Sequence, residues 1–225
     1  MSKKLVVYSD NCSGQNKNYN IVALWQYLVS SGKFDEIIHR FPIPGHTMMP
    51  CDRNFGDIER HLRSIETIYS PDEYAQHIAK SRVNNKFVVT QMSSDNFYYL
   101  SAILSTMTKR NVTVDKKKFD FRDVCQIRVT SEHPQCIEIK NTYEESEQWQ
   151  MVSLQKRGRQ VNIGEIQLKQ LYTSPRSIPK PKVDDVLSLV NWIPPVWHDF
   201  YKNILIDRTV TSIDVEVIDG SETNE

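Results

Sequence analysis

The sequence predicts an α/β fold, in which a parallel β-α-β unit with flanking helices is followed by a small β-rich region and C-terminal helices. Three observations favour this fold. Residues 5–9 form an apolar run that ends at Asp10, residues 19–30 are apolar on nearly every side, and short β-prone runs begin near residue 110. With 39% hydrophobic and 25% charged residues, the composition is that of a globular protein.

The first quarter of the chain predicts two strands joined by a helix. After the strand of residues 5–9, Asn18 is placed to cap a helix over Tyr19–Ser30, and Ile37–Phe41 is typical of a second strand. One helix between two strands makes those strands parallel. Because this helix is apolar on nearly every side, we expect it to lie between two layers.

Three further segments continue the alternation of helices and strands. Apolar residues between positions 55 and 65 recur at helical spacing. Ser70, followed by proline and then by an acid at the third helical position, predicts a helix that runs to about Val83. Beyond it, residues 86–90 predict a strand and residues 96–108 a helix.

The second half of the chain has a different character. Short β-prone runs predict a small antiparallel sheet or a barrel-like appendage, and they cover residues 112–114, 119–121, 125–130, 137–139 and 149–154. A proline-rich connector precedes two helices, in which the aromatic residues Trp192, Trp197, Phe200 and Tyr201 predict packing. The predicted domains are 1–109, 110–173, 174–206 and a flexible tail, 207–225.

Charge, hydropathy and cysteines exclude several classes of protein. The formal net charge is zero, so no overall basicity indicates nucleic acid, although enzymes that act on nucleic acid can confine their charge to one face. No apolar run is long enough to span a membrane, and the first residues lack the apolar core of a signal peptide. The four cysteines contain no CxxC pair, which favours an intracellular, reduced chain.

Asp10 is the leading candidate for a functional side chain. An acid at the carboxyl end of a strand lies where open α/β sheets bind ligands, and with a second carboxylate it can hold Mg²⁺ or Mn²⁺. The alternative is that Asp10 caps a turn. The polar residues that follow can contact phosphate or sugar oxygens, or can be a plain polar loop, and they include Asn11, Gln15, Asn16 and Lys17.

Asp52 and Glu59 compete for the role of the second acid. Asp52 can instead cap its helix, and Glu59 can instead pair with Arg63. His46 can be a ligand, a general base or an ordinary loop histidine. A zinc site from Cys12, His46 and Cys51 is a further alternative, but the spacing of these residues fits no standard pattern.

Two basic clusters lie in the β-rich region. They are candidates for contact with a nucleic-acid backbone, or are simply charged hairpin tips, and they comprise Lys116, Lys117 and Lys118, and Lys156, Arg157 and Arg159.

The blocks Asp10–Asn18 and Gly45–Glu59 together resemble a domain of unknown function that is widespread in transposon-derived reading frames of animals, with relatives in plants and algae. The segment Ile193–Tyr201 is similar to the C-terminal end of that family. The family in turn resembles the C-terminal part of an RNase H-like core of DDE/DDD-type transposases and integrases. The resemblance implies that Asp10 is the acid of the fourth strand and that Asp52 or Glu59 is the third acid.

The same resemblance implies a metal-dependent, phosphodiester-processing domain that acts on DNA in the nucleus, with Mg²⁺ or Mn²⁺ as cofactor. The first three strands and the first acid of such a core are expected upstream of Asp10. The chain is therefore expected to be inactive alone and to expose a sheet edge at its first strand, which an upstream segment or a partner chain completes. The alternatives are a non-catalytic remnant that binds nucleic acid or protein, and a zinc-dependent structural module.

Overall fold

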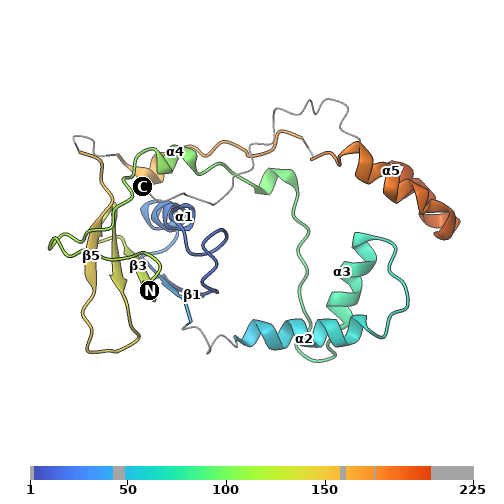
Figure 1. The fold of residues 1–225 in the computed structure, drawn as a ribbon, viewed down its shortest axis with the longest axis horizontal. Coiled ribbons are helices and arrows are strands. Elements are labelled where there is room, and N and C mark those ends of the chain that lie inside the picture. Colours follow the sequence, from blue (N-terminus) through green and yellow to red (C-terminus); the bar gives the residue numbers. More distant parts are fainter. Residues whose placement is uncertain (1–2, 43–48, 158–160, 175, 204–225) are drawn as a thin grey trace. The chain divides into compact units, whose positions relative to one another are not determined.

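A computed structural model describes residues 3–42, 49–157, 161–174 and 176–203 (Figure 1). The chain divides into two compact units, and each is described by itself. The first unit comprises Met1–Thr47 and Tyr98–Lys169, and the second comprises Met48–Phe97 and Gln170–Glu225. The predicted tail, 207–225, lies outside the described residues.

The predicted β-α-β unit is confirmed in the first unit. Strand β1 (Lys4–Tyr8), helix α1 (Tyr19–Ser30) and strand β2 (Glu36–Arg40) follow one another, and β1 and β2 are parallel. Helix α1 begins where expected because the Asn18 side chain accepts a hydrogen bond from the Ile21 N–H (3.1 Å). Ser31 and Gly32 end the helix, and Gly32 has a positive φ of 70°.

Three later strands extend this same sheet. They are β3 (Gln126–Thr130), β4 (Cys136–Lys140) and β5 (Gln150–Ser153), each antiparallel to its predecessor, and the strand order is β1-β2-β3-β4-β5. The sequence predicted a separate β-rich appendage, and this prediction is wrong, because β3, β4 and β5 belong to the same sheet as β1 and β2. The strands join one sheet because β2 and β3 share an apolar face, on which Ile37 of β2 lies opposite Val129 of β3.

One face of the sheet and helix α1 form the hydrophobic core. Both β4 and β5 contribute fully buried side chains to it, and its buried residues include Val22, Ala23, Ile37, Phe41, Ile127, Val129, Ile137, Ile139, Val152 and Leu154. Helix α4 (Ser101–Leu104) and a 3₁₀ turn (Ile163–Glu165) pack against α1 (Figure 1) and add buried Ile103 and Ile163. Helix α1 therefore lies between two layers, as expected.

The opposite face of the sheet is polar and largely covered. Arg128 donates hydrogen bonds to both carboxylate oxygens of buried Glu138 (2.7 and 2.8 Å). The ring of Trp149 lies over both the Arg128 guanidinium (4.5 Å) and the Lys140 ammonium (5.2 Å). The Arg128–Glu138 pair and the contacts of Arg128 and Lys140 with the Trp149 ring offset the cost of burying these charges.

The two edges of the sheet differ. Residues 107–114 cover β5, with the Thr108 N–H donating to the Leu154 carbonyl and the Val114 N–H to the Met151 carbonyl (both 2.8 Å). Strand β1 is the terminal strand at the other edge, and among the described residues it pairs only with β2. The expected open edge at the first strand is therefore confirmed.

The second unit is helical. It contains α2 (Pro50–Leu62), α3 (Pro71–Lys80), α5 (Lys180–Ser188) and α6 (His198–Lys202). The predicted start of α3 is confirmed, since the Ser70 hydroxyl accepts the Glu73 N–H (3.1 Å) and Glu73 accepts the Tyr69 N–H (2.7 Å). The predicted packing is wrong for Trp192, whose side chain is 84% exposed.

Two predicted elements between residues 86 and 108 differ from the structure. Residues 86–90 form no strand, and Val88 is 92% exposed. The helix expected over residues 96–108 is reduced to α4, because the Tyr99 N–H donates to the Lys169 carbonyl (2.9 Å) and holds this stretch extended. Such a distant backbone partner leaves no local pattern in the sequence.

Candidate functional site

The loop after β1 contains the candidate site. Asp10 follows the strand end and is exposed, and its Oδ1 accepts hydrogen bonds from the Cys12 N–H (3.2 Å) and the Asn16 amide (2.7 Å). Asp10 thus caps the turn, which is the alternative role considered for it in the sequence analysis. Oδ2 accepts no hydrogen bond from the described residues. Asp10 is therefore an exposed carboxylate with one oxygen held by two hydrogen bonds.

Asn11 and Lys17 tie the loop to the ends of two other segments. Asn11 donates to the Pro42 carbonyl after β2 (2.8 Å) and accepts from the Lys17 ammonium (3.0 Å). Lys17 also donates to the Arg122 carbonyl and lies 5.1 Å from the centre of the Phe41 ring. Its side chain is only 6% exposed, so Lys17, expected to contact nucleic acid, is instead an internal tether of the loop.

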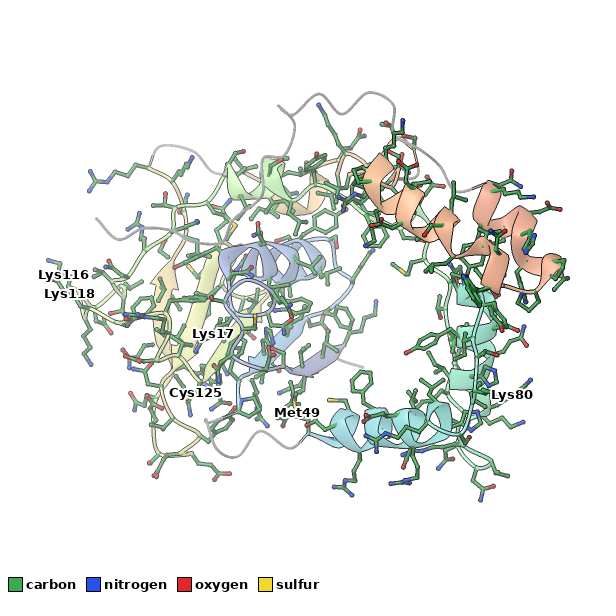
Figure 2. The ribbon with its side chains drawn as sticks, turned by 45° about the vertical axis from the view of Figure 1, so that its right-hand side comes forward. Lys17, Met49, Lys80, Lys116, Lys118 and Cys125 are labelled. Atoms are coloured by element: carbon green, nitrogen blue, oxygen red, sulfur yellow. The ribbon has the colours of Figure 1, made fainter. Side chains whose placement is uncertain are left out.

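Burial and nearby acidic groups have opposite effects on the charge of Lys17. Burial lowers the pKa of Lys17, and the nearby Cys125, Asp123 and Asp120 oppose that shift. Burial likewise raises the pKa of the Cys125 thiol, against the effect of Lys17. Hydrogen bonds from Arg122 lower the pKa of Asp120 to about 2. Lys17 and Cys125, both labelled in Figure 2, belong to the first unit, and no local pattern relates two positions so far apart in the sequence.

Ser9 and His39 have the arrangement of a nucleophile and a base, since Ser9 Oγ lies 2.8 Å from His39 Nε2. However, the Trp25 indole N–H donates to His39 Nδ1 (3.2 Å). A neutral imidazole that accepts at Nδ1 carries its proton on Nε2, so His39 donates to Ser9 and cannot take its proton. Burial also lowers the pKa of His39 to about 4. The network fixes the end of β1 and does not activate Ser9.

Asp52 and Glu59 both lie on α2, in the second unit, whereas Asp10 lies in the first. The Asp52 carboxylate accepts the Met49 N–H (2.7 Å) at the start of the helix. Glu59 accepts a hydrogen bond from Arg63 one turn later (2.7 Å). Both acids thus have the local roles that the sequence offered as alternatives, and their convergence with Asp10 stays a prediction.

The metal-ligand candidates are only partly within the described residues. His46 lies outside them. Across the described ranges, no group of three or more His, Cys, Asp or Glu residues is arranged to hold a metal ion. Cys12 and Cys51, two members of the considered zinc site, belong to different units and are free thiols.

The basic residues lie at the other edge of the sheet. Lys116 and Lys117 form the tip of a hairpin, where the Lys116 N–H donates to the Thr113 carbonyl (3.0 Å). Figure 2 shows Lys116 and Lys118 directed outward from this tip. Arg157 is exposed as well, as is Gln15 near Asp10, whereas Arg159 lies outside the described residues. With strands about 4.8 Å apart, four spacings separate β1 from β5 by about 19 Å.

In the described part of the chain, no helix has the length and apolar character needed to cross a bilayer.

Comparisons with known proteins identify a family and no function. No curated protein and no solved structure matches the chain. Residues 1–144, which include the whole loop around Asp10, match a family described as Domain of unknown function (DUF7869). Because this match covers more than half of the sequence, the chain belongs to the DUF7869 family.

Proposed function

We propose that the chain is part of a transposase-like, RNase H-like domain that processes phosphodiester bonds of DNA with Mg²⁺ or Mn²⁺. In this proposal Asp10 is a metal ligand, and Asp52 or Glu59 supplies a second carboxylate. The cation activates the attacking oxygen and stabilises the leaving oxygen. The observation that carries the proposal is the position of Asp10, two residues after the end of a strand of a parallel β-α-β unit.

The contacts of Asp10 suit a metal ligand. Hard cations such as Mg²⁺ bind carboxylate oxygens, and ligating carboxylates are themselves held by hydrogen bonds. The Cys12 N–H and the Asn16 amide hold Oδ1, and among the described residues Oδ2 accepts no hydrogen bond. Asn11, bonded to the Pro42 carbonyl, keeps the loop at the ends of β1 and β2. The residues present therefore fit the cation.

The open edge of the sheet supports the same proposal. In an edge strand, half of the backbone N–H and C=O groups face away from the sheet and are free to pair with another strand. β1 has such an edge, and Asp10 lies two residues after the end of β1. A strand supplied by another segment or by a partner chain would pair beside Asp10 and bring a further acid to it.

Calorimetric titration with Mn²⁺ tests the role of Asp10. We expect Asp10→Asn to weaken binding by about tenfold or more. Asp115→Asn is the matched control, because it makes the same change in charge at the exposed hairpin tip. Asp52→Asn and Glu59→Gln then decide which residue is the second ligand. Equal Mn²⁺ affinity of the Asp10→Asn variant and the wild type would refute the proposal.

A second candidate function is metal-independent binding of nucleic acid through the basic hairpin tip. Its support is the exposed position of Lys116, Lys117 and Lys118 at the tip of the hairpin. If it is correct, replacing Lys116 and Lys117 by glutamine weakens DNA binding in EDTA and reduces its salt dependence by about two phosphate contacts. Fluorescence anisotropy with a labelled duplex measures both. DNA binding that requires Mn²⁺ and ignores these lysines would contradict it.

A further inference from the structure

Two histidines lie side by side in the second unit. His61 is in the last turn of α2 and His77 is in α3, and their ring centres are 5.7 Å apart with the ring planes inclined by 42°. The connection between the helices is well fixed, because Ser70 caps α3 and the Tyr201 hydroxyl donates to the Tyr69 carbonyl (2.5 Å). The two rings are thus held together by the local fold of this unit.

Each ring has one buried nitrogen without a partner. His61 Nε2 and His77 Nδ1 are shielded from solvent and make no hydrogen bond to any described residue. Leaving such an atom unpaired costs roughly 1–3 kcal/mol, so an unpaired buried group in a folded protein indicates a missing partner. The contrast within this chain is clear. His39 uses both of its ring nitrogens, and His198 Nε2 bonds to the Ile193 carbonyl (2.8 Å).

We propose that His61 and His77 bind a divalent transition-metal ion of the Zn²⁺ type through these two nitrogens. Imidazole is a preferred ligand of such ions, with a bond of about 2.1 Å. Adding about 1.1 Å from nitrogen to ring centre places each ring centre about 3.2 Å from the ion. Two ring centres 5.7 Å apart then enclose an angle of roughly 125° at the ion, close to that of tetrahedral coordination.

The neighbouring acids are already used by other groups. Asp57, one turn before His61, accepts hydrogen bonds from Arg60 and Arg82. Glu73, one turn before His77, accepts the Tyr69 N–H. Among the described residues no third His, Cys, Asp or Glu is arranged to join the two rings, so the proposed site has two protein ligands and water would complete the coordination shell.

A metal clip has a structural use in this unit. Neither α2 nor α3 contains a buried residue, so the pair of helices has little apolar core of its own. A bound ion would join the two helices through two ring nitrogens that have no hydrogen-bond partner among the described residues. Metal binding energy then contributes to folding energy, as it does in small metal-stabilised domains. This site is independent of Asp10 and of the proposed processing of DNA.

A titration of the full chain with Co²⁺ tests the site, with visible absorption as the readout. We expect the wild type to bind one more equivalent of Co²⁺ than either His61→Gln or His77→Gln. In each variant the affinity of the site for Co²⁺ should fall by about tenfold or more. His133→Gln is the matched control, since His133 is exposed and lies in the first unit. Circular dichroism establishes that each variant is folded.

A second experiment follows the histidine resonances of the wild type and needs no variant. Zn²⁺ added to ¹⁵N-labelled chain should shift the imidazole resonances of His61 and His77 and leave that of His133 in place. It should also raise the melting temperature of the second unit, because an ion that binds only the folded state stabilises it. Unshifted His61 and His77 resonances at saturating Zn²⁺, or equal Co²⁺ stoichiometry in the wild type and both variants, would overturn the proposal.

Discussion

Acidification from pH 7 to pH 4 should destabilise the first unit through one side chain, His39. The ring is only 2% exposed, and burial lowers its pKa from 6.5 to about 4. In the unfolded chain the pKa returns to about 6.5, so between these values the unfolded chain binds a proton that the folded chain does not. The stabilisation is complete above pH 6.5 and is lost as the pH falls to about 4.

The size of the effect follows from the pKa difference. A shift of about 2.5 units corresponds to about 3 kcal/mol of unfolding free energy, a large part of the stability of an ordinary domain. The hydrogen bonds explain why the folded state resists protonation. The Trp25 indole already donates to Nδ1, so a proton on Nδ1 would set two donors against each other.

Urea unfolding at a series of pH values measures this contribution. His39→Gln keeps polar atoms beside Ser9 and Trp25 but cannot take up the proton. The wild type should therefore lose about 3 kcal/mol more than His39→Gln between pH 7 and pH 4. His133→Gln, at an exposed position, should follow the wild type. Parallel pH profiles for the wild type and His39→Gln would refute the reasoning.

Three substitutions test the packing of the two units. Gly164→Ala would place a Cβ 2.3 Å from the Ser30 carbonyl oxygen, so urea unfolding should show a loss of about 1–3 kcal/mol, and unchanged stability would contradict this close approach. Glu138→Gln removes the charge that pairs with half-buried Arg128 and should cost about 2–3 kcal/mol in the same assay, whereas a loss below about 0.5 kcal/mol would show that the pair is solvated. Ser70→Ala removes the helix cap of α3 and should cost about 1 kcal/mol, measured as the thermal stability of the second unit; a rise in helicity would contradict it.

Local signals allowed the start of the fold to be predicted from the sequence. Asn18 and Ser70 cap their helices as expected, because a cap is a contact between residues three positions apart. The strands β3, β4 and β5 were also located, but their place in the sheet of β1 was not. Strand pairing is a long-range property, and the alternation of apolar residues does not specify which strand is the neighbour.

In the candidate site, too, local contacts were predicted and long-range contacts were not. Asp10 and its turn partners lie within seven residues of one another, and capping of the turn was foreseen as an alternative. The burial of Lys17 was not, because its partner Arg122 lies 105 residues away. The His61–His77 pair was also missed, since two ordinary histidines sixteen residues apart match no metal-binding motif. Only the packing of α2 on α3 brings the two rings together.

The unequal edges of the sheet determine how copies of this protein can associate. Among the described residues, 107–114 occupy part of the outer edge of β5, whereas the outer edge of β1 is open, so strand pairing between molecules is favoured at β1. Two molecules joined strand to strand at β1 would each turn the partly covered β5 edge to the solvent. Pairing through β1 alone would join two copies and no more, because each copy then has its open edge occupied.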